Sequence, residues 1–216
     1  VFSAEQNALV TVNAEKYYRA MIHGGPHSWN VRDRHMADTL DRLLKFHGEN
    51  SKVIVWEHNT HIGDARATDM ADEGMFNIGE LARMQHNDKG VVLVGFGSYK
   101  GTVMAGHSWG AKMQAMQMPE ARKGSWEYLL HSADKENRLL ILDDFTHNDM
   151  FMENHIGHRA IGVVYNPQYE QYGNYVPSIL PLRYDAFIYL DETRALYPLH
   201  IEPDGRQMPE TYPFGV

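Results

Sequence analysis

The sequence predicts an α/β protein with a mixed or largely parallel sheet flanked by helices. Short apolar runs rich in β-branched residues recur along the chain, which is typical of strands that are covered on both faces. Amphipathic segments of helical period lie before and between these runs, as expected where helices cover a sheet. The predicted strands are Lys52–Trp56, Val91–Val94, Leu139–Leu142, Ile161–Val164 and Ala186–Leu190.

The first 50 residues are expected to be helical. A loose stripe of apolar residues at helical spacing runs through 5–22, and the Gly-Gly-Pro sequence at 24–26 ends it. A second helix is expected to begin near Ser28 or Asn30, because either side chain can accept from the amides of a first turn. With Asn30 as the cap, Asp33 would lie in the first turn, where the helix dipole favours a carboxylate.

Shorter elements are expected after the first predicted strand. Asn77 begins a capping box that predicts a helix to about His86, and Ser125 opens another short helix. The glycine-rich stretch 95–101 is expected to form a tight turn, and 165–183 a long loop of the kind that is often functional.

The length of 216 residues fits one large domain, without an internal repeat or a separating linker. We therefore expect one α/β domain over 1–216. It would consist of a helical segment at 1–50, an α/β portion at 51–200 and an extended tail at 201–216.

The composition excludes several classes of function. Twenty Lys and Arg against 28 Asp and Glu give a net charge of −8, which argues against nucleic acid or an anionic membrane as a partner. The sequence has no cysteine, so disulfides, thiolate metal ligands and a cysteine nucleophile are excluded. No apolar run approaches the ~20 residues of a transmembrane helix. These features fit a cytoplasmic protein.

Two histidines follow the first predicted strand in the sequence His58-Asn59-Thr60-His61. On a strand, residues three apart point to opposite faces, so the two rings converge only if the chain turns after the strand. Ligand crevices of open α/β sheets lie at the carboxyl ends of strands, and histidine transfers protons near neutral pH. A catalytic pair is one interpretation, and two hydrogen-bonded loop histidines without a chemical role are the other.

A second cluster places Asn30, Arg32 and Asp33 within one helical turn. Such a group can orient a polar or anionic ligand near backbone amides at a helix start. A capping residue in a solvated, charged turn explains the same residues without a ligand.

A metal site is a further alternative. His58, His61 and Asp64, with His35, have the nitrogen and oxygen donors that zinc accepts. The metalloprotease pattern His-Glu-x-x-His is absent. A second, looser set of donors comprises Asp143, Asp144, His147, His155 and His158.

Several motifs occur in a fixed order along nearly the whole chain. They are Ser28–Asp33, His58–Arg66, Val94–Gly97, Gly101–Val103, Ile161–Tyr165, Gly173–Pro177, Arg183–Phe187 and Pro209–Pro213. In this order they resemble the erythromycin esterase family.

The resemblance implies an α/β fold with helical insertions and a deep cleft. It implies hydrolysis of a carboxylic ester or lactone, a small-molecule substrate, by histidine-assisted attack of water without a metal or cofactor. His58 and His61 would hydrogen-bond the attacked carbonyl or the water. The implied substrate-binding and supporting residues are Asn30, Arg32, Asp33 and Asp64. Which ester is hydrolysed, macrolides included, stays open.

Two departures from the family pattern stand out. The family's N-terminal Gly-Glu-x-x-His-Gly motif, which supplies a general-base histidine and a glutamate, is absent, since His47-Gly48-Glu49 has another order. The chain thus resembles the C-terminal half to two-thirds of a member. We expect a fold that is incomplete at its N-terminus and a partner in an N-terminal segment of the same polypeptide. The second departure is Glu57, which stands where the family more often has alanine.

The missing motif also supports an alternative from another class. The chain could be a catalytically silent binding or regulatory module that keeps the cleft and lacks the base.

Overall fold

The computed structural model describes residues 1–196. The chain divides into two compact units. Unit 1 comprises 1–95, 142–154 and 178–186, and unit 2 comprises 96–141, 155–177 and the chain from 187 onward.

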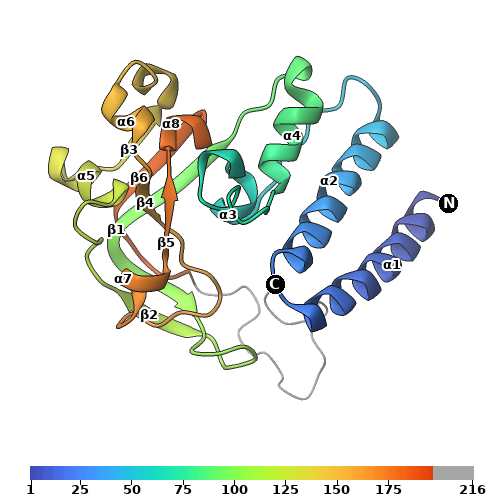
Figure 1. The fold of residues 1–216 in the computed structure, drawn as a ribbon, viewed down its shortest axis with the longest axis horizontal. Helices are drawn as coiled ribbons and strands as arrows, with labels where there is room; N and C mark the ends of the chain where they lie inside the picture. Colours follow the sequence, from blue (N-terminus) through green and yellow to red (C-terminus); the bar gives the residue numbers. More distant parts are fainter. Residues whose placement is uncertain (197–216) are drawn as a thin grey trace. The chain divides into compact units, whose positions relative to one another are not determined.

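Unit 1 begins with two long helices, α1 (Phe2–His23) and α2 (His27–His47), which lie side by side (Figure 1). Gly24 and Gly25 between them have φ angles of 68° and 78°, a backbone region that favours glycine. The predicted helices and the break between them are therefore confirmed.

The predicted cap of α2 is wrong. The helix begins at His27 after Pro26, without a side-chain cap and without an acidic residue in its first turn. Pro26 already has the helical φ of −70°, so the helix starts before Asn30 and places Asp33 in its second turn. Both polar side chains make tertiary contacts instead of capping the helix.

The rest of unit 1 consists of α4 and several shorter elements. They are α3 (Asn59–Ile62), η1 (Ala65–Ala67), α4 (Ile78–His86), η2 (Asn87–Lys89), η3 (Leu142–Phe145), α6 (Asp149–Glu153) and α8 (Leu180–Arg183). The predicted cap of α4 is confirmed, because the Asn77 side chain accepts the Glu80 N–H at 2.9 Å. A core of Ala37, Leu40, Ile78 and Leu81 packs α2 against α4.

Unit 2 contains nearly all of a four-stranded sheet in the order β2-β1-β6-β3. Its strands are β1 (Val94–Ala105), β2 (Gln114–Met118), β3 (Arg138–Ile141) and β6 (Ala186–Thr193). Strands β1 and β2 are antiparallel. Strands β1 and β6 run parallel, since the chain pairs near Leu93 with Asp185 and near Gly101 with Thr193. The sheet is therefore mixed.

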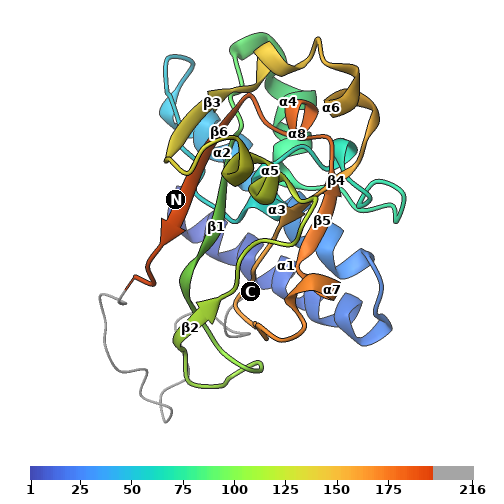
Figure 2. The same cartoon turned by 90° about the vertical axis from the view of Figure 1, so that its left-hand side faces the viewer.

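The other elements of unit 2 include a second, two-stranded sheet (Figure 2). They are α5 (Trp126–Ala133), β4 (Ile156–Arg159), α7 (Glu170–Gly173) and β5 (Tyr175–Ser178). The predicted helix start at Ser125 is confirmed, because its side chain accepts the Tyr128 N–H. The predicted class, an α/β fold with a mixed sheet flanked by helices, is confirmed.

The prediction of a buried strand at Lys52–Trp56 is wrong. Val53, Ile54 and Val55 are 47%, 90% and 37% exposed. Their backbone makes no hydrogen bond to the backbone of any other described residue. A β-branched run forms a strand only beside another strand that accepts and donates hydrogen bonds, and no strand within 1–196 pairs with this one.

The predicted glycine turn at 95–101 is also wrong, because β1 runs through it. A Cβ atom on Gly95 would lie 2.7 Å from the Tyr184 ring, and one on Gly97 would lie 2.5 Å from the Phe187 ring. These glycines therefore let aromatic rings approach the strand closely.

Three further predictions for the second half of the chain have mixed outcomes. The runs at 139–142 and 186–190 correspond to β3 and β6, whereas 161–164 forms only an isolated bridge between Val164 and Gly106. The predicted loop 165–183 contains α7, β5 and α8. The predicted tail at 201–216 lies outside the described residues, and one domain over 1–216 stays a prediction. Within 1–196, no helix is long and apolar enough to cross a bilayer.

Candidate functional site

The most developed polar site of unit 1 is a buried carboxylate paired with a histidine. Nδ1 of His61, at the end of α3, lies 2.9 and 3.0 Å from the two carboxylate oxygens of Asp33 on α2. Asp33 is fully buried. Its Oδ2 also accepts the N–H of Ile78, the first residue of α4, at 3.1 Å. A helix N-terminus stabilises such a buried carboxylate.

The second ring nitrogen of His61 identifies the tautomer. Its Nε2 lies 3.2 Å from Nη2 of Arg32. A guanidinium only donates hydrogen bonds, so Nε2 must be the acceptor. Nδ1 therefore carries the proton and donates it to Asp33. In this arrangement Nε2 has the lone pair that a general base needs.

Packing holds the imidazole of His61 in place. The Trp29 ring stacks on it at 4.3 Å with an interplanar angle of 4°. The Trp29 indole N–H donates to the Phe76 carbonyl at 2.8 Å, and the Arg32 guanidinium lies 4.8 Å from the Trp29 ring. The His61 side chain is still 16% exposed, so solvent or a ligand can reach it.

His58 has the opposite tautomer. It is exposed and caps α3, with Nδ1 accepting the Thr60 N–H at 3.3 Å and lying 2.9 Å from the Thr60 hydroxyl. In the neutral ring the proton is then on Nε2, which makes this nitrogen a donor. The turn of α3, rather than the end of a strand, follows His58. That both rings face one substrate stays a prediction.

Asn30 and Asp64 do not contact His61 but hold the loops around it. The Asn30 amide bridges the Gly74 carbonyl at 2.9 Å and the Phe76 N–H at 3.1 Å, and thus fixes the carbonyl that Trp29 binds. Asp64 is buried and pairs with Arg66 and Arg83. Burial alone would raise the pKa of the Asp64 carboxyl, but these guanidinium groups hold it below its ordinary value.

The candidate metal ligands do not assemble in the part of the chain that the structure describes. No three His, Asp or Glu side chains among residues 1–196 are arranged to hold an ion. In the first set, His61 is paired with Asp33 and Asp64 with two arginines. In the second, the buried His158 pairs with Glu127 at 2.6 Å.

Two further residues of this site did not stand out as candidates in the sequence. Trp29 stacks on His61, and only its place within the Ser28–Asp33 motif could have indicated a role. Glu57 interacts electrostatically with His61, Asp33 and Arg32. Its departure from the family pattern was visible in the sequence, but its neighbours were not.

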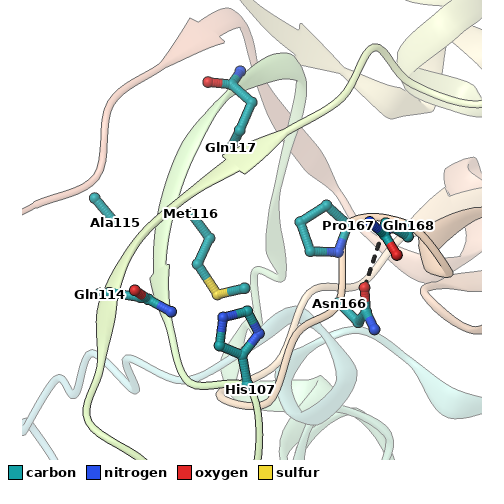
Figure 3. Close-up of a pocket in the computed structure, with 8 residues that line it drawn as sticks. All are labelled: His107, Gln114, Ala115, Met116, Gln117, Asn166, Pro167 and Gln168. Atoms are coloured by element: carbon teal, nitrogen blue, oxygen red, sulfur yellow. Dashed lines mark hydrogen bonds between the residues drawn. The ribbon is translucent and has the colours of Figure 1, made fainter.

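Unit 2 has an open hollow that contains none of the predicted site residues (Figure 3). Its lining is rich in amide side chains and comprises His107, Gln114, Ala115, Met116, Gln117, Asn166, Pro167 and Gln168. It offers no carboxylate to orient the single histidine.

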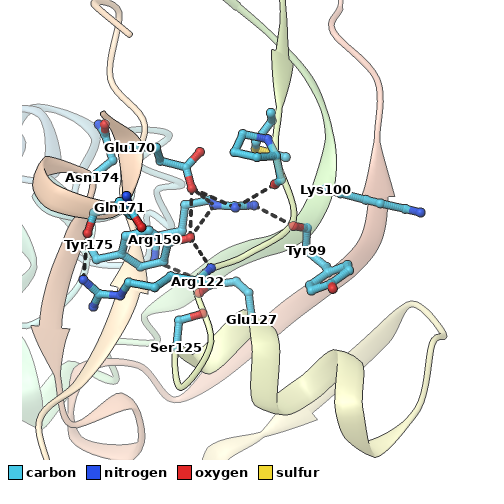
Figure 4. Close-up of polar contacts among 12 residues, drawn as sticks. Tyr99, Lys100, Arg122, Ser125, Glu127, Arg159, Glu170, Gln171, Asn174 and Tyr175 are labelled. Atoms are coloured by element: carbon cyan, nitrogen blue, oxygen red, sulfur yellow. Dashed lines mark hydrogen bonds and ion pairs between the residues drawn. The ribbon is translucent and has the colours of Figure 1, made fainter. Parts of the chain in front are cut away.

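Unit 2 also contains a buried ion cluster around Arg159 (Figure 4). Its guanidinium donates to the carbonyls of Ser98 and Tyr99 at 2.8 Å and of Pro119 at 2.9 Å. It also donates to the Glu170 carboxylate at 3.0 Å. Backbone carbonyls and one carboxylate accept hydrogen bonds from the N–H groups of this guanidinium. The cluster therefore stabilises unit 2 rather than binding a ligand.

The fold is that of an α/β protein, and a buried carboxylate orients His61 where α2, α3 and the start of α4 meet. A family model described as erythromycin esterase matches residues 1–193, and the chain belongs to that family.

Three solved structures share the fold at low sequence identity. A succinoglycan biosynthesis protein is 18% identical with a TM-score of 0.61, covering 83% of this chain and 41% of its own. A protein from Bacillus cereus is 16% identical with a TM-score of 0.60, covering 78% and 40%. The erythromycin esterase mutant EreC in its open conformation is 17% identical with a TM-score of 0.51, covering 76% and 38%. The chain thus spans about two-fifths of the length of these structures.

Proposed function

We propose that this chain is the catalytic portion of a hydrolase that cleaves a carboxylic ester or lactone by histidine-assisted attack of water, without a metal. The observation that carries the proposal is the Asp33–His61 pair, in which Nδ1 donates to a buried carboxylate and Nε2 is an acceptor. The same division of roles orients the histidine of serine hydrolases toward its proton donor. Here the proton donor is water.

Binding of a substrate frees the general base, Nε2 of His61, by drawing Arg32 away from it. Without substrate, the Arg32 guanidinium donates a hydrogen bond to Nε2 of His61 at 3.2 Å. A substrate carbonyl is a competing acceptor for this guanidinium. When Arg32 turns to the carbonyl, Nε2 becomes available to the attacking water, and the arginine then faces the negative charge that develops on the carbonyl oxygen.

His58 supplies a second donor in this proposal. Its Nε2 carries the proton, because Nδ1 accepts from Thr60. The N–H can therefore stabilise the oxyanion of the tetrahedral intermediate. Asn30 and Asp64 keep their predicted place in the site as supports of the loops that flank His61.

Variants of the two histidines test the proposal. We expect His61→Gln to lower kcat/KM on a panel of p-nitrophenyl esters and lactones by ~10²–10⁴-fold, as loss of a general base does. His58→Ala should lower it by at least ~100-fold, as loss of an oxyanion donor does. Steady-state kinetics with and without a chelator measure both effects.

His86→Gln is the matched control. His86 pairs with Asp41 at 2.6 Å in the same unit and is outside the site. Its variant should keep the activity of the unmodified protein. Full activity in a folded His61→Gln variant would contradict the proposed mechanism. An unmodified full-length protein that binds ligands but turns over no ester or lactone would favour the silent binding module.

The proposal includes an N-terminal segment of the same polypeptide as partner. The solved structures with this fold are more than twice as long as the part that this chain covers. The exposed residues Val53–Val55 have the composition of a buried strand and no backbone partner among the described residues. A strand supplied by the additional segment would pair with them and cover their side chains.

Hydrogen exchange tests this pairing. We expect the amides of Val53–Val55 to exchange rapidly in the 216-residue chain and at least ~100-fold more slowly in the full-length protein. The reason is that a strand amide exchanges only when its hydrogen bond opens. Amides of β1 that pair with β2 serve as the control and should be protected in both. Equally rapid exchange at 53–55 in both proteins would contradict the proposed partner.

A further inference from the structure

Glu57 is a second carboxyl group near the Asp33–His61 pair, with both members of which it interacts electrostatically. It lies in the extended segment just before His58 and is half-buried. Its Oε2 is buried without a hydrogen-bond partner. Among the 196 described residues, only three other side chains have a buried polar atom without a partner, and none of these belongs to the site.

A buried oxygen without a donor is far less costly in a neutral carboxyl group than in a carboxylate. The surroundings favour the neutral form. Burial raises the pKa of Glu57, the charge of Asp33 raises it further, and His61 and Arg32 only partly offset these effects. The neighbouring His58 is neutral when it accepts from Thr60.

We infer that Glu57 is the general acid of the site, which protonates the leaving oxygen of the ester or lactone. This inference rests on the proposed hydrolase function. It divides the two proton transfers of the reaction between two residues, with His61 as the base and Glu57 as the acid. Pairs of groups that an active site holds in opposite protonation states commonly share the work in this way.

The protons balance over one turnover. Water gives a proton to Nε2 of His61 while its oxygen bonds to the acyl carbon. The bond between the acyl carbon and the alkoxy oxygen then breaks, and this oxygen takes the proton of Glu57. The products are a carboxylic acid and an alcohol. The imidazolium of His61 returns its proton to the Glu57 carboxylate, which restores the starting state.

Esters whose leaving groups differ in acidity distinguish a general acid from a residue with a structural role. An alkoxide leaves poorly without a proton, whereas p-nitrophenolate leaves without one. We therefore expect Glu57→Gln to lower kcat/KM about 100-fold for an alkyl ester or a lactone, and less than about threefold for a p-nitrophenyl ester. For the alkyl substrate, the fall of activity at high pH that reflects ionisation of Glu57 should also disappear.

Two controls accompany the measurement. Glu80→Gln removes another half-buried carboxyl whose pKa is raised by burial, but one that faces Asp64 rather than His61, and it should change neither activity. His61→Gln, measured in parallel, should lower both activities. Equal losses for both esters in Glu57→Gln, or no loss in either, would overturn the role of Glu57. Unchanged activity in His61→Gln would instead contradict the proposed function.

A titration of the carboxyl group provides a readout that needs no substrate. With ¹³C-labelled glutamate, the side-chain carboxyl carbon assigned by its loss in Glu57→Gln should titrate above the ordinary range of glutamate. Titration at or below that range would overturn the inference.

Discussion

Replacing Asp33 by asparagine should lower kcat/KM by ~10³–10⁴-fold while the fold stays intact. The asparagine amide oxygen must accept the Ile78 N–H that Oδ2 of Asp33 now accepts at 3.1 Å. Its NH₂ group then faces Nδ1 of His61 and forces this nitrogen to become an acceptor. The proton moves to Nε2, which can no longer take one from water. The corresponding change in a serine protease triad costs about 10⁴-fold in kcat.

Asp41→Asn controls for the effect of such a change outside the site. Asp41 forms a comparable pair with His86 in unit 1, with 2.6 Å between Nε2 and Oδ1. Its variant should keep full activity. Steady-state kinetics on an ester and a circular dichroism spectrum check both proteins. A folded Asp33→Asn variant within about threefold of the unmodified activity would show that Asp33 does not set the tautomer of a catalytic histidine.

The largest loss of stability is expected from Arg159→Met. Arg159 is only 5% exposed, and its removal leaves Glu170 buried without its counter-charge. Burial, together with the Glu170 charge, raises the pKa of Tyr175 to about 12, so its hydroxyl stays protonated and donates to Glu170. The Tyr165 hydroxyl also donates to Glu170, but two neutral phenols do not replace the charge of the lost guanidinium. Breaking a buried ion pair on one side costs ~3–5 kcal/mol, which corresponds to a decrease in Tm of roughly 6–20 °C at this chain length.

Two companion variants make the stability experiment decisive. Arg138→Met removes an arginine from a partly exposed ion pair with Asp134 and should cost less than about 1 kcal/mol. The double variant Arg159→Met/Glu170→Met removes both buried charges and should recover much of the loss. Denaturant unfolding measures all three. Equal stability of Arg159→Met and Arg138→Met would contradict the stabilising role of the buried cluster around Arg159.

The four longest helices, α1, α2, α4 and α5, could be predicted because their signals are local. The Asn77 cap, the Ser125 cap and the Gly-Gly-Pro break each depend on residues within one turn of each other. Strands depend on neighbours far along the chain. Lys52–Trp56 has the composition of a buried strand but no partner in the described residues, and Gly95–Gly101 looks like a turn although aromatic rings pack on its glycines.

The residues of the candidate site were accessible from the sequence, but their arrangement was not. Motifs singled out His61, Arg32 and Asp33, and the structure brings these three together. The element that positions His61 differs from the expected one, because His61 lies on the helical turn α3 rather than at the end of a strand. Asp64 has the same residue type as Asp33, yet two arginines bind it. Only the tertiary structure distinguishes these two aspartates.

The protonation of the His61 ring tests the account most directly. Nitrogen-15 chemical shifts of histidine-labelled full-length protein at neutral pH report which ring nitrogen carries the proton, and His61→Gln assigns the signals. We predict a protonated Nδ1 and an unprotonated Nε2 in the unmodified protein, with the two exchanged in Asp33→Asn. A proton on Nε2 in the unmodified protein would contradict the assignment of His61 as the base that activates water.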